Sequence, residues 1–337
     1  MLFSFFLNKI AHNKDLSVEE SRAAFNSIFE GDVSSDDLAT FLLNLSRKGE
    51  TVDELWGAAL SMRSKALTIQ APPGTIDIVG TGGDGHDTYN ISTAVALVVA
   101  ACGVSVAKHG NRSASSRSGS SDVLESLGIK LDISFDILER CLREANVCFL
   151  FAPVHHPAMR HVGAVRKNLA VRTIFNLLGP LTNPANVTRH MIGVYDLDWL
   201  GPMAEVLKLL GSEAAWLVHG HDGMDEITTT NATDVVQLHQ GMITHFTLEP
   251  EHVGLRRVSL SSLKGGDSLA NAEALRQLVL GAKGAYRDIV VFNAAAALVV
   301  ARKTTDLKNG ITLAEFALDN GQAYATLNKL IRLTQGN

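Results

Sequence analysis

The residues best suited to chemistry lie in a glycine-rich segment, Gly80–Gly85, followed by Asn-Ile-Ser-Thr at 90–93. β-Branched residues at 76–79 predict a strand before the glycines, and the apolar run after position 93 predicts a buried helix. Glycines permit positive φ and close backbone approach, and free N–H groups at a helix N-terminus attract phosphate. The pattern therefore indicates an anion site, and we expect Ser92 and Thr93 at the helix N-cap.

The spacing of these glycines departs from two familiar phosphate loops. No lysine follows them, as the P-loop would require. Gly80, Gly82 and Gly85 match the letters of the dinucleotide pattern Gly-x-Gly-x-x-Gly, but Asp84 inside the turn is unfavourable beside a pyrophosphate. A plain structural turn is the competing interpretation, and the polar residues that follow the glycines weaken it.

A second polar cluster occupies 108–122, after an expected strand at 104–107. It places three cations, two glycines and six serines in fifteen positions, and we expect a helix to follow near 123. A solvated loop is the alternative, because loops favour such residues. Lysine and arginine with serine hydroxyls would nevertheless hold a strongly anionic ligand.

These blocks resemble the anthranilate phosphoribosyltransferase family. The resemblance also includes Val-Arg-Lys at 165–167, Arg172–Pro184 and His-Gly-His-Asp-Gly-Met-Asp-Glu at 219–226. The blocks occur in the family's order, and the start and tail of the chain fit in length. The resemblance therefore covers essentially the whole chain.

The resemblance implies transfer of phosphoribose from 5-phosphoribosyl 1-diphosphate (PRPP) to the amine of anthranilate. The products would be N-(5-phosphoribosyl)anthranilate and diphosphate, in the second step of tryptophan biosynthesis from chorismate, with Mg²⁺ as cofactor at two ions per subunit. An oxocarbenium-like transition state calls for charge neutralisation of the diphosphate and close positioning of the amine. An aromatic amine is already neutral at pH 7, so no general base is assigned.

The resemblance also assigns site residues. The residues that it implies for PRPP are Gly80, Gly83, Asp84, Thr88, Asn90, Ile91, Ser92, Thr93, Lys108, His109, Gly110, Asn111, Arg112, Ser113, Ala114, Ser115, Ser116 and Ser120. Those that it implies for anthranilate are Gly80, His109, Asn111, Arg166 and Pro180. Those that it implies for magnesium are Ser92, Asp225 and Glu226.

Weaker interpretations of these residues remain open. Arg166 could be a surface arginine of a helix, and Arg160 and Arg172 are rival partners for the anthranilate carboxylate. Adjacent acids such as Asp225 and Glu226 are commonly a solvated edge, although oxygen ligands completed by substrate suit Mg²⁺.

Composition is that of a well-packed globular protein, with 46% hydrophobic and 19% charged residues in 337 positions. A net charge of −5 argues against a general nucleic-acid binder, and no apolar run approaches the ~20 residues of a membrane span. The three cysteines form no Cys-x-x-Cys pair and are expected to be reduced, as in a cytoplasmic protein. The apolar start at 1–7 is too short for a signal peptide and predicts a buried helix.

Two kinds of pattern divide the chain. Capping boxes beginning at Ser17 and Thr51, and a helix start at Ser34 or Ser35, predict a helical domain over 1–72. Beyond it, strands and helices alternate, with further strands expected at 147–151, 191–195 and 215–218. This alternation predicts an α/β domain over 73–337, with a mixed or parallel sheet flanked by helices. The resemblance adds a segment near 158–178 that returns to the helical domain, and a homodimer paired through the helical domains.

Other functions fit the sequence less well. Histidines at 155–156 and at 219 and 221 could bind zinc, but no third ligand shows metal-site spacing. A Ser-His-Asp triad lacks its Gly-x-Ser-x-Gly turn. A pyrimidine nucleoside phosphorylase would carry a different glycine loop, and a nucleic-acid-binding paralogue would show a basic groove. The sequence Lys-Gly-Gly-Asp-Ser at 264–268 also suggests phosphate, but a plain turn is expected because no clear strand precedes it.

Overall fold

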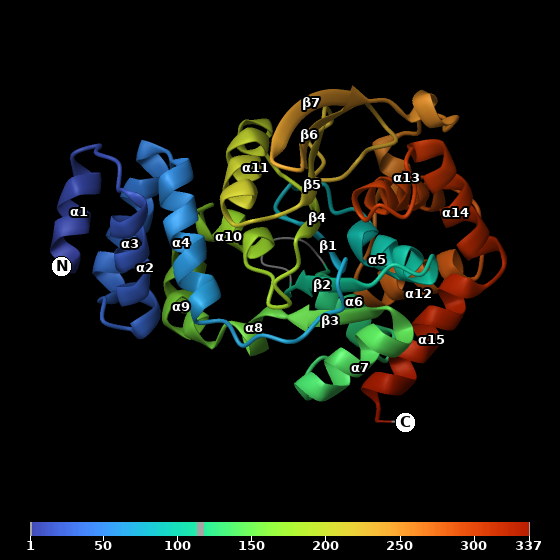
Figure 1. Ribbon diagram of the computed structural model, residues 1–337, viewed down its shortest axis with the longest axis horizontal. Helices are drawn as coiled ribbons and strands as arrows, with labels where there is room; N and C mark the ends of the chain where they lie inside the picture. Colours follow the sequence, from blue (N-terminus) through green and yellow to red (C-terminus); the bar gives the residue numbers. More distant parts are fainter. Residues whose placement is uncertain (1, 113–117, 337) are drawn as a thin grey trace.

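The N-terminal part of the chain is a bundle of helices that stands to one side of a sheet (Figure 1). The computed structural model describes residues 2–112 and 118–336. The helices of the bundle are α1 (Phe3–Ala11), α2 (Val18–Glu30), α3 (Ser35–Lys48) and α4 (Val52–Ser64).

Side-chain caps begin three of these helices, as the sequence predicts. Ser17 accepts from the backbone N–H of Glu20, whose carboxylate accepts from Ser17 in return, and Thr51 and Glu54 repeat the arrangement. Ser34 caps α3 by accepting from the backbone of Asp37. Each such cap stabilises its helix by about 0.5–2 kcal/mol.

Helices α2 and α4 approach closely at Gly57. A Cβ atom on this residue would lie 2.4 Å from the carbonyl oxygen of Val18 and 2.7 Å from Cβ of Ser21. The lack of a side chain at Gly57 therefore allows α4 to pack this close to α2.

The remainder of the chain is organised around a mixed sheet, which confirms the predicted fold class. Within the described residues it has seven strands in the order β3-β2-β1-β4-β5-β6-β7. The first five in that order are parallel, and β6 and β7 are antiparallel. The strands are β1 (Ile76–Gly80), β2 (Val106–Gly110), β3 (Val147–Phe151), β4 (Arg189–Gly193), β5 (Ala214–Gly220), β6 (Thr233–His239) and β7 (Met242–Leu248).

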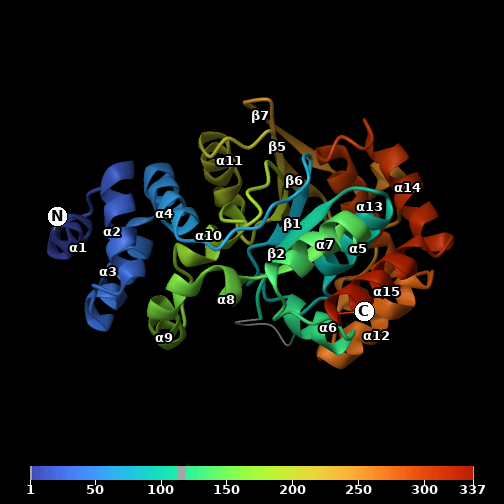
Figure 2. The same ribbon diagram turned by 60° about the horizontal axis from the view of Figure 1, so that its bottom comes forward.

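Helices cover both faces of the sheet (Figures 1 and 2). Successive strand residues point to opposite faces, so Met191 belongs to the core beneath α5 and α13, and Ile192 belongs to the core beneath α11. The helices are α5 (Ile91–Ala101), α6 (Ser120–Ser126), α7 (Phe135–Ala145), α8 (Ala152–His155), α9 (Arg160–Leu169), α10 (Phe175–Leu181), α11 (Leu200–Leu209), α12 (Ser268–Val279), α13 (Ala285–Val300), α14 (Leu307–Asp319) and α15 (Gln322–Thr334).

The core on the α11 side continues into the helical bundle. Helix α9 packs against α2 and α3, and α10 and α11 pack against α4. The ring of Phe175, at the start of α10, meets Phe25 and Phe29 edge-on at centroid distances of 5.8 and 6.1 Å. Residues from the middle of the chain thus complete the bundle.

Several boundaries differ from those expected. β2 and β4 are displaced by about two residues from the predicted 104–107 and 191–195, and the antiparallel strands β6 and β7 were not predicted. None of the helices in the described parts of the chain has the length and apolar character needed to cross a bilayer.

We predict that Gly57→Ala lowers the free energy of unfolding by about 1–3 kcal/mol, because the added methyl group forces α2 and α4 apart. Urea unfolding followed by circular dichroism measures the change. Gly201→Ala in α11 is the matched control: nothing lies within 4 Å of the new Cβ, and we expect no loss of stability there because alanine favours helix. Equal effects of the two substitutions would contradict the prediction.

Candidate active site

A cavity of about 610 Å³ opens where β1 and β2 end, between the sheet and helices α9 and α10. Ligands in open parallel sheets bind at this carboxyl edge. Every described residue that the family resemblance assigned to the site lies in the wall of this cavity. These residues are Gly80, Gly83, Asp84, Thr88, Asn90, Ile91, Ser92, Thr93, Lys108, His109, Gly110, Asn111, Arg112, Ser120, Arg166, Pro180, Asp225 and Glu226.

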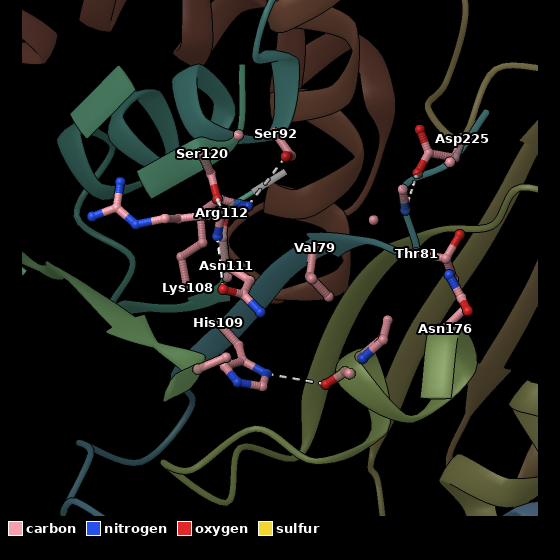
Figure 3. Close-up of a pocket in the computed structure, with 18 of the residues that line it drawn as sticks. Val79, Thr81, Ser92, Lys108, His109, Asn111, Arg112, Ser120, Asn176 and Asp225 are labelled. Atoms are coloured by element: carbon pink, nitrogen blue, oxygen red, sulfur yellow. Dashed lines mark hydrogen bonds between the residues drawn. The ribbon is translucent and has the colours of Figure 1, made fainter. Parts of the chain in front are cut away.

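The glycine loop after β1 is held by three backbone contacts. Thr81 donates its N–H to the carbonyl of Gly193 at 2.9 Å, and its hydroxyl accepts from the N–H of Tyr195 at 3.0 Å. The N–H of Gly82 donates to the Asp225 carboxylate at 2.8 Å (Figure 3). Gly82 and Gly83 have φ of 66° and 78°, a region that favours glycine.

Helix α5 begins two to three residues earlier than expected. Its N-cap residue is Asn90, with no side-chain capping bond, so Ser92 and Thr93 lie inside the first turn and the expectation that they cap the helix was wrong. The Ser92 hydroxyl instead accepts from the ammonium of Lys108 at 3.1 Å (Figure 3). Lys108 also donates to the carbonyl of Ile78 at 2.6 Å.

Negative charge is concentrated on one side of the cavity. Burial and repulsion from Asp84 raise the pKa of Asp225 to about 7. Burial and then repulsion from Asp225 raise the pKa of Glu226, while attraction to Lys108 opposes the rise. Burial in turn lowers the pKa of Lys108.

A divalent cation fits this arrangement of crowded oxygen ligands, because it would relieve their repulsion. Ser92, Asp225 and Glu226 supply hard oxygen atoms of the kind that Mg²⁺ prefers. Among the described residues, no group of three or more His, Cys, Asp or Glu side chains could hold a metal ion. Substrate oxygens or water would therefore have to complete the coordination of an ion at this position.

The part of the cavity formed by α9, α10 and His109 has more apolar side chains in its wall. His109 is buried, and its Nδ1 lies 3.0 Å from the carbonyl oxygen of Gly179, so Nδ1 carries the proton (Figure 3). Burial lowers the pKa of His109 well below its usual value, which keeps the ring neutral. The guanidinium carbon of Arg166 lies 5.3 Å from the centroid of the Phe175 ring, and burial lowers the pKa of Arg166.

The rival arginines are placed differently. Arg160 is an exposed residue of the cavity wall, and its Nε donates to His161 at 3.1 Å. Arg172 donates to the carbonyl of Gly83, and its guanidinium carbon lies 4.2 Å from the centroid of the Tyr195 ring. Arg172 thus connects the segment between α9 and α10 to the glycine loop, a contact that sequence reasoning missed.

Other residues of the second polar loop are only partly placed. Arg112 is exposed and forms ion pairs with Asp122 at 2.7 Å and Glu125 at 2.8 Å. Ser120 donates to the backbone carbonyl of Asn111 at 3.2 Å. The expected ligands Ser113, Ala114, Ser115 and Ser116 lie outside the described residues.

The histidines considered for zinc make separate contacts. His155 binds the carbonyl of Leu67 through Nδ1 at 2.7 Å, and His219 binds that of Val194 at the same distance. His221 pairs with Asp234 at 2.9 Å. His156 lines the cavity, as do Thr81 and Asn176, which the sequence did not single out.

Two family models match the chain, one over the helical bundle and one over the part that contains the sheet. Residues 5–66 match the family model described as glycosyl transferase family, helical bundle domain, and residues 72–324 match glycosyl transferase family, a/b domain. The chain is 52% identical to anthranilate phosphoribosyltransferase of Rhodopseudomonas palustris over 332 residues, with 98% of each chain covered.

Solved structures of anthranilate phosphoribosyltransferases have the same fold as this chain. Anthranilate phosphoribosyltransferase from Thermus thermophilus is 43% identical, with a TM-score of 0.92 and coverage of 98% of this chain and 99% of that one. The Saccharomyces cerevisiae enzyme in complex with PRPP and Mg is 27% identical, with a TM-score of 0.91 and coverage of 99% and 98%. The same yeast enzyme in complex with 4-fluoroanthranilate is 26% identical, with a TM-score of 0.89 and coverage of 100% and 99%.

The family models span nearly the whole chain, one relative shares half of its residues, and the fold is the same. The chain therefore belongs to the anthranilate phosphoribosyltransferase family.

Proposed function

We propose that the chain transfers phosphoribose from PRPP to the amine of anthranilate, with Mg²⁺ bound and through an oxocarbenium-like transition state. The observation that carries this proposal is one continuous cavity with two chemically different ends. One end offers glycine-loop and helix N–H groups with a buried lysine, and the other offers apolar side chains, including Phe175, with an arginine beside them.

The polar end suits the donor. Backbone N–H groups at the start of α5 and in the glycine loop would bind phosphate oxygens. Lys108 would stabilise the departing diphosphate, and the loop 110–116 with Ser120 would cover it. Asp84 would face the ribose or water bound to magnesium. Charge stabilisation of the leaving group is the main contribution that these residues make.

The carboxylate side of the cavity would hold magnesium. Ser92, Asp225 and Glu226 are its proposed ligands, at two ions per subunit. Bound Mg²⁺ would neutralise the charge that develops on diphosphate. The residues themselves orient the donor, because Asp225 also fixes the glycine loop through Gly82.

The apolar end suits anthranilate. Arg166 would pair with the carboxylate, Asn111 would lie near the amine, and Gly80, His109 and Pro180 would form walls around the ring. Close placement of amine and anomeric carbon then replaces the need for a general base.

We also propose how the chain is arranged in the cell. The helical domain would consist of 1–72 with the returning segment 158–178, and the donor-binding domain of 73–337. Two copies would pair through their helical domains, where Leu2 and Phe5 are exposed on and beside α1. The enzyme would act in the cytoplasm on small molecules, without nucleic acid or membrane.

The loss of anthranilate fluorescence tests the reaction. With PRPP and Mg²⁺ present, we expect fluorescence to decay as the amine is substituted. The decay should stop in chelator and return when Mg²⁺ is restored in excess. A flat trace from folded protein would contradict the proposed function, and salt-dependent retention on DNA or phosphorolysis of thymidine would point to the other members of this fold.

Arg166→Ala should raise the KM for anthranilate about 10- to 100-fold, the loss expected for one hydrogen-bonded charge pair. The KM for PRPP should stay within about twofold, because Arg166 packs against Phe175 of α10 and not against the glycine loop or α5. Arg172→Ala is the matched comparison, since Arg172 holds Gly83: it should raise mainly the KM for PRPP. Equal loss of affinity for both substrates in Arg166→Ala would refute the assignment.

Glu226→Ala should lower kcat at least about 100-fold, as expected when an electrostatic contact to the leaving group is removed. Tenfold more Mg²⁺ should not restore it. Steady-state rates over a magnesium titration measure the effect, with Glu205→Ala on the surface of α11 as a charge-matched control that should remain active. Full activity in Glu226→Ala would remove this carboxylate from the mechanism.

A further inference from the structure

The side chain of Asn90 stands at the junction of the two polar loops. It precedes α5, lines the cavity and donates from Nδ2 to the carbonyl of Ser118 at 3.3 Å. Its Oδ1 accepts a hydrogen bond at 2.9 Å from Nδ2 of Asn271, a residue 181 positions later in α12. The orientation of the Asn90 carboxamide is therefore set from outside the cavity wall.

Asn271 is built into its position. Its side chain is only 2% exposed, and its Oδ1 accepts from the N–H of Gly266 at 2.7 Å. With Oδ1 occupied by this backbone donor, Nδ2 must be the group that faces Asn90. A carboxamide fixed in this way determines which end of the Asn90 amide accepts and which end donates.

The turn that contains Gly266 also supports the segment before Asn90. Gly265 donates to the carbonyl of Asp87 at 2.9 Å, and Tyr89 donates to the carbonyl of Leu263 at 3.1 Å. A Cβ on Gly265 would lie 2.7 Å from Oδ1 of Asn271 and 2.8 Å from the carbonyl oxygen of Thr88. The glycines of this turn therefore serve close backbone approach.

An aromatic pair supports the same segment from a third element. The rings of Tyr89 and Tyr286 stack with centroids 4.4 Å apart, and the Tyr286 hydroxyl donates to the backbone carbonyl of Asn90 at 3.4 Å. The backbone of Asn90 is thus fixed by α13, which leaves the direction of its amide to Asn271.

We propose that Asn271 is a positioning residue for the donor: it turns the Asn90 amide so that its NH₂ group faces Ser118 and the cavity. This inference rests on the proposed function, since it concerns binding of PRPP. A reversed amide would present a carbonyl oxygen where a polyanionic ligand needs a hydrogen-bond donor. The effect of Asn271 on the substrate passes through Asn90.

Two substitutions separate orientation from packing. Asn271→Ala removes the contact and should raise the KM for PRPP about five- to tenfold, the value of one hydrogen bond. In Asn271→Asp the carboxylate can still accept from Gly266, but Asn90 must turn its NH₂ group toward it. We expect this nearly isosteric variant to raise the KM for PRPP at least as much, with the KM for anthranilate within about twofold in both variants.

A double-mutant cycle tests the route through Asn90. Asn90→Ala should raise the KM for PRPP, and adding Asn271→Ala to it should change that KM by less than about twofold. Leu275→Ala, a buried residue one turn along α12, is the packing control: it should lower the melting temperature and leave the KM for PRPP unchanged.

The possible failures are distinct. Wild-type protein without PRPP-dependent turnover would overturn the proposed function and this inference with it. Active wild-type protein with an unchanged KM for PRPP in Asn271→Asp would overturn the inference alone. Independent effects of Asn90→Ala and Asn271→Ala, or an equal rise in KM in Leu275→Ala, would also overturn it.

Discussion

The structure depends on one electrostatic conflict: buried carboxylates and a glycine loop that offers backbone N–H donors share the same wall of the cavity. Asp225 accepts from Gly82, so the acid side fixes the loop whose backbone would receive phosphate. The raised pKa values of Asp225 and Glu226 show that this charge is costly as it stands. A site of this kind favours a ligand that brings its own divalent cation, because metal and phosphate neutralise each other and the residues on either side.

Lys108 illustrates why position matters more than residue type. Its ammonium lies buried between the Ile78 carbonyl and the Ser92 hydroxyl, so it contributes a fixed positive potential from beneath the wall. Burial lowers its pKa, and the acids Asp77, Glu226 and Asp225 oppose that shift. A flexible surface lysine would lose much of the same interaction to solvent screening.

Much of the architecture could be predicted from local pattern, because caps, glycine turns and apolar runs act over a few residues. The capping boxes at Ser17 and Thr51 and the order of strands and helices followed from such signals. Strand limits were less accurate, and β7 was missed because it forms the sheet edge with mostly exposed residues. The contacts of Arg172 with Gly83 and of Asn271 with Asn90 join positions 89 and 181 residues apart, and no local pattern encodes such pairs. Distant contacts also affect the start of α5. Ser92 and Thr93 have side chains suited to an N-cap, but the Ser92 hydroxyl accepts a hydrogen bond from Lys108 in β2, and the helix begins after Asn90.

The two ends of the cavity also differ in how they treat protons. At the apolar end, Gly179 accepts from Nδ1 of His109, and burial keeps the imidazole uncharged. In the proposed complex with anthranilate, a neutral ring would neither compete with Arg166 for the carboxylate nor protonate the amine. Burial and the hydrogen bond to a single carbonyl thus keep the His109 ring uncharged, while the carboxylates and Lys108 lie together on the other side of the cavity, where the proposed leaving group would bind. The fold separates these two parts of the cavity by forming them from different elements. The strand ends and α5 form one part, and α9 and α10 form the other.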